Sequence, residues 1–305
     1  MNKRYCFNQD EIENIINRFG KDFYEKVLRD IETYADKWTL TSFQLIPSYS
    51  ANLVFKCYSA KYGNVVLKIG NPSFEEIITE FNTLSQYNGR RFCRVFDADI
   101  DNGVILEERV QPGTPLRDES SLDKRLDVFC SLYKGLHLTP VNAEIYPTYT
   151  GWVNRITEYM SDRQDCNELY LHMKKAKDIC FSVASLYSQQ MLLHGDFHHD
   201  NILLDHDGEY RIIDPKGVIG DPVFDVPRFI LNEFGEEITT ELHKKINHII
   251  CIFEKILNIP NEILKQCLYV ETAMGICWCV EGGSTPEEYP SLLKNVAFAE
   301  SILNA

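Results

Sequence analysis

The stretch Leu193–Pro215, LHGDFHHDNILLDHDGEYRIIDP, decides the fold of this chain. In it a polar loop is followed by the apolar run Ile202–Leu204, the pair Asp207-Gly208 and a second short apolar run. Two such runs around Asp-Gly predict a β-hairpin. If that pair forms a two-residue turn, Asn201 lies opposite Asp214. A longer turn shifts the register by one residue without separating the two side chains.

The predicted hairpin gathers three side chains that suit phosphoryl transfer. Mg²⁺ prefers a few protein oxygens and takes its other ligands from water and nucleotide phosphates, so Asn201 and Asp214 are the predicted metal ligands. Asp196 precedes Asn201 by five residues. It is the predicted catalytic residue, which would accept a hydroxyl proton and orient that oxygen for attack on a γ-phosphate. D-x-x-x-x-N followed by a hairpin and a second Asp is typical of kinase catalytic loops.

Simpler interpretations of the same residues stay open. A metal hydrolase would need histidine spacings such as H-E-x-x-H, which the chain does not show around its four nearby histidines, His194, His198, His199 and His206. His194 is expected to orient the loop by hydrogen bonding. Asp205 and Asp207 are expected to be turn residues, because Asp tolerates unusual backbone angles. An inert surface loop is the remaining alternative.

The string HGDFHHDNIL joined to IDPKGVIGDPVFD resembles the aminoglycoside phosphotransferase branch of the kinase-like superfamily. Within that branch it is similar to the aminoglycoside/hydroxyurea resistance kinases, whose best-known members are streptomycin 6-kinases. The resemblance implies an α+β, bilobal protein-kinase-like fold that binds ATP between its lobes. Residues 1–110 would form an N-terminal helical extension and a small antiparallel-sheet N-lobe. Residues 111–305 would form a mainly helical, catalytic and substrate-binding C-lobe.

The predicted nucleotide lobe contains a second hairpin with one informative lysine. Apolar residues alternate over residues 53–69, and Lys68 ends the run VVLK, where kinases place the lysine that holds the α- and β-phosphates. A solvated strand lysine is the alternative. A helix is expected over residues 72–87. The resemblance implies that its Glu80 pairs with the nucleotide-binding lysine, and Glu76, one turn earlier, could substitute.

Two further segments of this lobe are expected to contact ATP. The turn 47–52 lacks glycine, and small residues such as Ser50 would have to bring backbone N–H groups toward phosphate. A buried strand then runs into a Pro-Gly turn, as expected of a linker between lobes. The resemblance implies that backbone groups near Glu107 and Arg109 bond the adenine edge, while Leu106 lines the adenine pocket.

The second half of the chain is dominated by helical periodicity, with breakers after the metal ligand. Lys216 is predicted to touch the transferred phosphate or a substrate oxygen, although a surface turn position explains it equally well. Asp221, in the same segment, is a candidate substrate contact. Asp225 is either the N-cap of a helix or, by resemblance, a support for the catalytic-loop backbone.

Two residues near the end of the last long apolar helix are candidate substrate contacts. Trp278 lies where streptomycin kinase-like sequences have a tryptophan, and Glu281 could meet a cationic antibiotic. A buried tryptophan and an exposed helix-end glutamate explain them as well.

Composition narrows the class of protein. The 305 residues are 44% apolar and carry a net charge of −14, which argues against a nucleic-acid partner and suits a cationic substrate. The ten cysteines include no C-x-x-C pair and are expected to be reduced. We expect no signal peptide and no membrane span, and therefore a cytoplasmic protein. A monomer or a dimer is expected.

The sequence therefore predicts a kinase that uses ATP and Mg²⁺ to phosphorylate a small-molecule hydroxyl, with an aminoglycoside such as streptomycin as the leading acceptor. A kinase of choline, a sugar or an amino-acid alcohol would use the same catalytic residues. A non-catalytic nucleotide-binding protein would be expected to lack one of Asp196, Asn201 and Asp214, and none is missing. The choice between ATP and GTP stays open.

Overall fold

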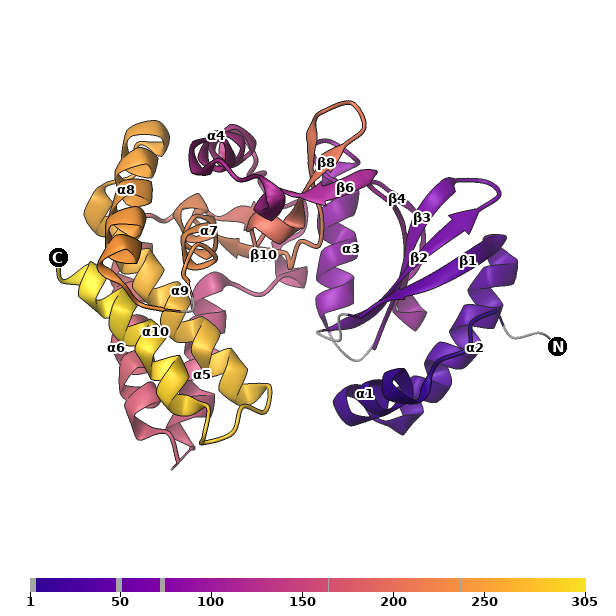
Figure 1. Ribbon diagram of the computed structural model, residues 1–305, viewed down its shortest axis with the longest axis horizontal. Coiled ribbons are helices and arrows are strands. Elements are labelled where there is room, and N and C mark those ends of the chain that lie inside the picture. The colour runs from indigo at the N-terminus through magenta and orange to yellow at the C-terminus, as the bar shows by residue number, and fades with distance from the viewer. Residues whose placement is uncertain (1–3, 48–50, 72–74, 164, 236) are drawn as a thin grey trace. The chain divides into compact units, whose positions relative to one another are not determined.

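The computed structural model describes residues 4–47, 51–71, 75–163, 165–235 and 237–305 (Figure 1). The chain folds into two compact units. Unit 1 comprises Met1–Thr114 and Leu203–Ile213, and unit 2 comprises Pro115–Ile202 and Asp214–Ala305. The hairpin 203–213 thus belongs to unit 1, whereas the sequence placed a single boundary at residue 110. Backbone hydrogen bonds explain this, since Ile212 donates to Arg91 (2.8 Å) and accepts from Cys93 (3.0 Å).

Unit 1 is built on a five-stranded antiparallel sheet in the order β1-β2-β3-β5-β4. Its strands are β1 (Leu40–Ile46), β2 (Asn52–Ser59), β3 (Gly63–Gly70), β4 (Val95–Asp99) and β5 (Val104–Glu108). The predicted hairpin over residues 53–69 is confirmed as β2 and β3, which pair Val54 with Lys68. The apolar residues that alternate along β2 and β3 share one buried face, opposite to the face on which Lys68 lies: Leu53, Phe55, Cys57, Val65, Leu67 and Ile69.

Three helices accompany this sheet: α1 (Gln9–Phe19), α2 (Lys21–Lys37) and α3 (Glu75–Tyr87). A capping box between Asn8 and Glu11 begins α1, and Gly20 separates α1 from α2 at a φ of +88°, which favours glycine. Helix α2 lies beside β1 (Figure 1). Its buried side chains, including Val27 and Ile31, join the sheet residues in one apolar core.

The predicted catalytic-loop hairpin forms with a longer turn than the two-residue one. Strands β6 (Pro112–Pro115), β8 (Ile202–Asp205) and β9 (Tyr210–Ile212) form a sheet in the order β6-β8-β9. The backbone N–H of Asp205 donates to Glu209 (2.8 Å), which leaves three residues in the turn, the last being Gly208 at a φ of +81°. The Asp205 carboxylate stabilises this turn by accepting from two backbone N–H groups, at Asp207 and Glu209. The register is therefore shifted by one residue.

Unit 2 is mainly helical. Its helices are α4 (Leu122–Tyr133), α5 (Tyr149–Ser161), α6 (Asn167–Leu186), α7 (Pro227–Leu231), α8 (Thr240–Leu257), α9 (Asn261–Glu281) and α10 (Tyr289–Leu303). Helices α5, α6, α9 and α10 pack together (Figure 1). A short antiparallel pair, β7 (Met191–Leu193) and β10 (Val218–Gly220), flanks the predicted catalytic loop, residues 194–201, in the chain. The 3₁₀ turn η4 (His199–Asn201) lies between these two strands in the chain and directly precedes β8. A second 3₁₀ turn, η5 (Pro222–Asp225), follows β10.

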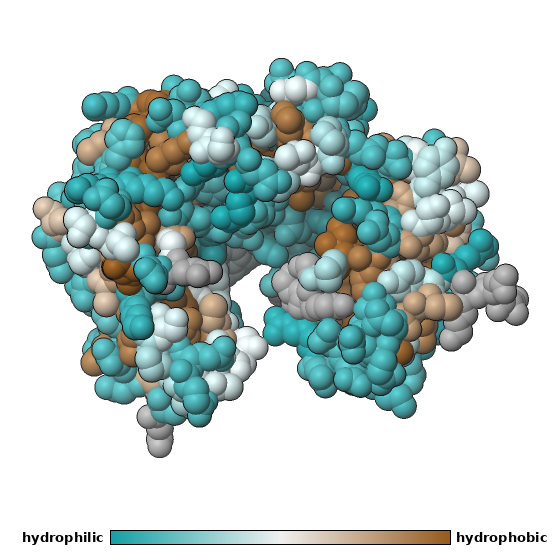
Figure 2. Space-filling model, viewed as in Figure 1, coloured by the Kyte–Doolittle hydropathy of each residue, from teal (hydrophilic) through white to brown (hydrophobic). Residues whose placement is uncertain are grey.

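The length and composition of helix α9 depart from the expectation that no segment approaches a membrane span. By length and composition this helix could cross a membrane, but 72% of its most apolar window is buried inside the protein. The core helix of a globular unit meets the same criterion, so the finding is weak evidence for a membrane. The face of the molecule shown in Figure 2 is mostly hydrophilic, with separate apolar patches.

Candidate active site

The catalytic loop is supported by one buried carboxylate. Asp225 accepts hydrogen bonds from the backbone N–H of His194 and of Gly195, both at 2.8 Å, and its Oδ2 lies 2.9 Å from His137 Nε2. Burial opposes the charged form, but these partners lower the pKa of Asp225. The N-cap interpretation of Asp225 is wrong, because Val226 occupies the N-cap of α7. The support of the loop backbone, implied by the family resemblance, is what the structure shows.

Two features of the H-G-D tripeptide fix the loop. Gly195 has a φ of +78°, and a Cβ at this position would come within 2.9 Å of the Trp152 ring, so only glycine fits. His194 Nδ1 accepts the backbone N–H of Asp196 at 3.1 Å. The predicted orienting role of His194 is therefore confirmed.

The side chain of Asp196 is partly exposed and surrounded by cationic or polar groups. Its Oδ1 lies 3.3 Å from Arg228 Nε and 3.5 Å from His198 Nε2. Burial raises the pKa of this carboxyl, but the hydrogen bond with His198 and the positive charges of Arg228 and Lys216 outweigh burial and lower the pKa overall. The carboxylate is therefore ionised at neutral pH, as a proton acceptor must be.

Asn201 and Asp214, the predicted metal ligands, both carry side-chain oxygen atoms and both belong to unit 2. Asn201 Nδ2 donates to the backbone carbonyl of Asp196 at 2.9 Å, so the amide oxygen is the atom that can serve as a ligand. Asp214 has a φ of +58°, a left-handed conformation that is uncommon outside glycine and clusters at functional sites. Lys216 Nζ lies 4.0 Å from Asp214 Oδ2. An amide oxygen and a carboxylate fit Mg²⁺.

The histidines near the loop do not form a metal cluster. Across the residues that the structure describes, no group of three or more His, Cys, Asp or Glu side chains could hold an ion. His199 is stacked on Phe229 with ring centroids 3.8 Å apart, and its Nε2 lies 2.8 Å from Glu233. His206 is exposed in the hairpin turn. These positions contradict the alternative of a histidine-based hydrolase site.

In unit 1, Lys68 is buried between two glutamates. Its Nζ forms an ion pair with Glu80 and lies 3.4 Å from Glu107 Oε2. Glu76 is exposed, which excludes it as the buried partner. The alternative of a solvated strand lysine is wrong. Sequence reasoning gave Glu107 only a backbone role and missed its side chain, although strand pairing offered a signal: Ile105 faces Lys68, so Glu107 lies diagonally on the same face.

The remaining predicted nucleotide contacts lie on or near β5. Leu106 is fully buried opposite Leu67. The backbone N–H of Arg109 donates to Asn64 (3.3 Å), so an adenine contact at Arg109 would have to use its carbonyl. Ser50 lies outside the described residues.

The candidate substrate contacts are placed differently from one another. Asp221 is buried and accepts the backbone N–H groups of Gln189 and Val223, both at 3.1 Å, which is a turn-stabilising position. Glu281 forms an exposed ion pair with Arg155 (Nη2–Oε2, 2.9 Å). Trp278 is half-buried, and the Arg228 guanidinium lies 5.8 Å from its ring centroid. Arg228 also contacts Asp196, so a single side chain connects Trp278 with Asp196.

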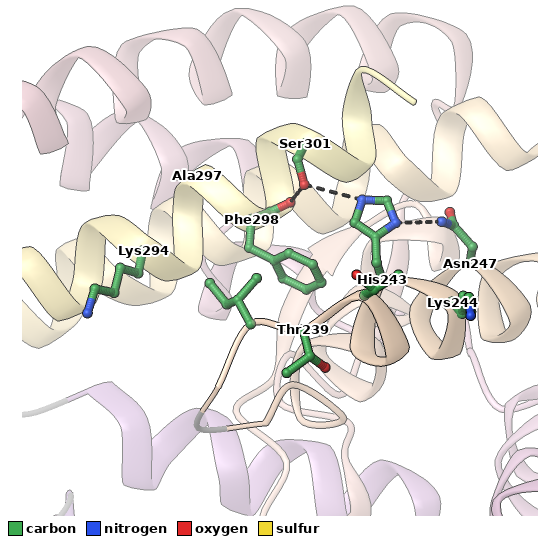
Figure 3. A pocket seen from close by; sticks show the side chains of 10 residues that line it. Thr239, His243, Lys244, Asn247, Lys294, Ala297, Phe298 and Ser301 are labelled. Carbon is green, nitrogen blue, oxygen red and sulfur yellow. Dashed lines mark hydrogen bonds between the residues drawn. The ribbon is translucent and has the colours of Figure 1, made fainter.

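A cavity of about 650 Å³ lies elsewhere in unit 2, between α8 and α10. Figure 3 shows His243 between Asn247 and Ser301, with nitrogen-to-partner distances of 3.0 and 3.4 Å. Phe298 closes one side. No predicted site residue lines this cavity, so its size does not make it the active site.

Glu80 is predicted to orient Lys68 for nucleotide phosphates. Glu80→Gln removes the negative charge of the Lys68 ion pair while Glu107 stays beside the lysine, and we expect the KM for ATP to rise about tenfold, equivalent to about 1.4 kcal/mol. Glu76→Gln, which changes an exposed glutamate one turn earlier, is the matched control. Initial rates of ADP release against ATP concentration measure both, and an equal KM in the two variants would contradict the assignment.

Comparison with known proteins agrees with this geometry. Residues 37–283 match the aminoglycoside/hydroxyurea antibiotic resistance kinase family. The chain is 26% identical over 199 residues to streptomycin 6-kinase of Streptomyces griseus, covering 63% of this chain and 62% of that protein. It is 26% identical over 224 residues to hydroxyurea phosphotransferase of Kitasatospora aureofaciens, covering 70% and 64%. The chain thus spans just under two thirds of the length of these relatives.

Solved structures share the fold. Choline kinase LicA from Streptococcus pneumoniae superposes with a TM-score of 0.64 at 15% identity, covering 92% of this chain and 99% of LicA. Aminoglycoside phosphotransferase APH(4)-Ia, in a ternary complex with ADP and hygromycin B, gives 0.58 at 12% identity, covering 90% and 97%. The predicted protein-kinase-like α+β fold is confirmed. The chain belongs to the aminoglycoside/hydroxyurea antibiotic resistance kinase family, a family of small-molecule phosphotransferases.

Proposed function

We propose that this protein transfers the γ-phosphoryl group of ATP to a hydroxyl of a cationic aminoglycoside, with streptomycin as the leading acceptor and the cytoplasm as its compartment. The observation that carries the proposal is the state of Asp196. Its side chain is partly exposed and lies 3.3 Å from Arg228 Nε, and its backbone carbonyl accepts a hydrogen bond from the Asn201 amide at 2.9 Å. A loop with this chemistry is expected of a kinase that acts on alcohols.

Each unit supplies its own part of the proposed reaction. In unit 1, Lys68 would hold the α- and β-phosphates, with Glu80 fixing the orientation of its ammonium group. In unit 2, Asp196 would accept the proton of the acceptor hydroxyl and align that oxygen with the γ-phosphorus. Asn201 and Asp214 would hold Mg²⁺, whose chemistry when bound is to neutralise charge on the phosphate oxygens.

Two observations support a cationic acceptor. The net charge of −14 attracts cations over long range, and a relative is a streptomycin 6-kinase. Two other observations favour a second candidate, a small neutral hydroxyl compound such as hydroxyurea. Glu281, the candidate cation-binding group, already pairs with Arg155, and another relative is a hydroxyurea phosphotransferase.

A panel of acceptors separates these candidates. We expect ADP release from MgATP to depend on streptomycin and to yield a product that is one phosphoryl group heavier by mass spectrometry. Hydroxyurea, choline, a hexose and homoserine serve as comparison acceptors at equal concentration. Turnover with hydroxyurea but not streptomycin would select the second candidate, and turnover with choline, the hexose or homoserine alone would overturn both.

A further inference from the structure

Arg228, in the short helix α7, contacts the predicted catalytic carboxylate although no motif in the sequence marks it. Its Nε lies 3.3 Å from Asp196 Oδ1, and its Nη2 lies 2.7 Å from Glu271 Oε1. The guanidinium is therefore shared between one carboxylate at the candidate active site and one in the core of unit 2. Its side chain is 19% exposed, so water screens these charges weakly.

The Glu271 carboxylate, the second partner of the Arg228 guanidinium, is held in place by its own contacts. Its side chain is 3% exposed, and its second oxygen accepts the hydroxyl of Tyr149 at 2.6 Å. Both carboxylate oxygens are thus engaged, one by a residue of α7 and the other by a residue of α5. Burial raises the pKa of Glu271, while the nearby Arg228 opposes that rise. Because α5 packs against α9, the hydrogen bond from Tyr149 fixes the Glu271 carboxylate, and this carboxylate in turn holds the guanidinium in one place.

The contact with Asp196 is close, but it is not a well-formed hydrogen bond. Within the described part of the chain, the buried Nε of Arg228 has no hydrogen-bond partner of good geometry. The attraction to Asp196 is therefore electrostatic, and it fixes the carboxylate without consuming a lone pair in a linear hydrogen bond. A lone pair of Asp196 stays available for the proton of an acceptor hydroxyl.

A third contact limits the freedom of the guanidinium. The Trp278 ring centroid lies 5.8 Å from Cζ, the guanidinium carbon of Arg228. Trp278 in turn packs edge to face against Trp152, with ring centroids 5.6 Å apart. Because a carboxylate and an aromatic ring already restrict the Arg228 side chain, it loses little further conformational freedom when the acceptor binds.

We propose that Arg228 is the positioning residue that fixes the carboxylate of Asp196, and that Glu271 and Tyr149 hold Arg228 in place. The inference rests on the proposed function, because it assigns Arg228 a task only if Asp196 accepts the acceptor proton. Arg228 itself needs no contact with ATP or with the acceptor.

The test removes both buried charges together. Arg228→Met alone would leave Glu271 buried without its cation and could unfold the protein, so Arg228→Met is combined with Glu271→Gln. Arg228→Lys is the conservative variant. The matched control is Arg163→Met, which removes an arginine from the Asp165 ion pair of the same unit, away from the catalytic loop. Thermal unfolding and ADP titration calorimetry verify that each variant is folded and binds nucleotide.

We expect the double variant to lose about 100-fold in kcat with streptomycin, the loss typical of a catalytic group displaced by about 1 Å. The KM for streptomycin and the affinity for ADP should match those of the Arg163→Met control, which separates positioning from binding. Arg228→Lys should restore part of kcat. A crystal structure of the double variant should show the Asp196 side chain moved or in several orientations.

Two outcomes would overturn the inference. One is a double variant whose kcat equals that of the Arg163→Met control, and the other is an Asp196 side chain that keeps its orientation without Arg228. If the unaltered protein does not phosphorylate streptomycin, the proposed substrate fails. The orientation of Asp196 in the crystal structure of the double variant then decides the positioning role by itself.

Discussion

Asp196→Asn should lower kcat by about 10²–10⁴-fold, the range that general base catalysis contributes. The amide has nearly the shape of the carboxylate but cannot accept the proton of the acceptor hydroxyl. Folding and nucleotide binding should persist, because the loop is fixed by the backbone contacts of Asp225 and His194 rather than by the Asp196 carboxylate. The measurement is acceptor-dependent ADP release under saturating MgATP.

The matched control for this experiment is Asp207→Asn. Asp207 is an exposed aspartate in the turn of the neighbouring hairpin, with a side chain that is 69% exposed, so its replacement should leave kcat unchanged. Unfolding temperature and ADP affinity should be the same in both variants. An Asp196→Asn protein that retained the kcat of Asp207→Asn would remove Asp196 from its proposed role.

Asp214→Asn should raise the Mg²⁺ concentration needed for half-maximal activity by at least about 10-fold. Loss of a group that hydrogen-bonds to a metal ligand already costs metal sites about 10–100-fold in affinity, and the loss of a charged direct ligand should cost no less. Asparagine is the substitution of choice because the backbone at this position is left-handed, with a φ of +58°, and asparagine tolerates that conformation better than alanine. Full activity should return at high Mg²⁺ if the backbone is undisturbed.

The measurement is ADP release across a magnesium titration at fixed ATP, with EDTA as the metal-free reference. Asp207→Asn again serves as the control for removal of one negative charge. An unchanged half-saturating Mg²⁺ concentration in Asp214→Asn would exclude Asp214 as a ligand. Loss of activity that no Mg²⁺ concentration restores would instead indicate a structural role for this carboxylate.

Several site residues could be predicted from local sequence patterns. The tripeptide around Asp196 and the spacing to Asn201 are fixed by a few consecutive backbone turns, so sequence alone placed both residues on one loop. Lys68 could also be identified from the sequence, because it ends the apolar run VVLK, and strand alternation puts it on the face of β3 opposite to Val65, Leu67 and Ile69. Glu80 was chosen over Glu76 from the family resemblance, because the two lie one turn apart on the same side of α3; only the structure shows that Glu80 is buried and Glu76 exposed.

Other features depended on contacts that no local pattern encodes. The hairpin turn has three residues because the Asp205 carboxylate accepts from the turn backbone, which the Asp207-Gly208 pair did not reveal. Asp221 was expected near substrate but is buried against backbone N–H groups. Glu107 was expected to act only through its backbone, yet its side chain lies beside Lys68.

The sequence by itself determined the fold family, the residues of the predicted catalytic loop and the lysine of unit 1. These depend on residue type, spacing and periodicity over short stretches, where each residue constrains its neighbours directly. Only the tertiary structure decided which distant charges surround that loop. Arg228 and Glu271 are separated by 43 positions in the chain, and their pairing beside Asp196 results from how α7 packs against α9. Such contacts are set by the packing of whole helices, because no short segment contains both partners.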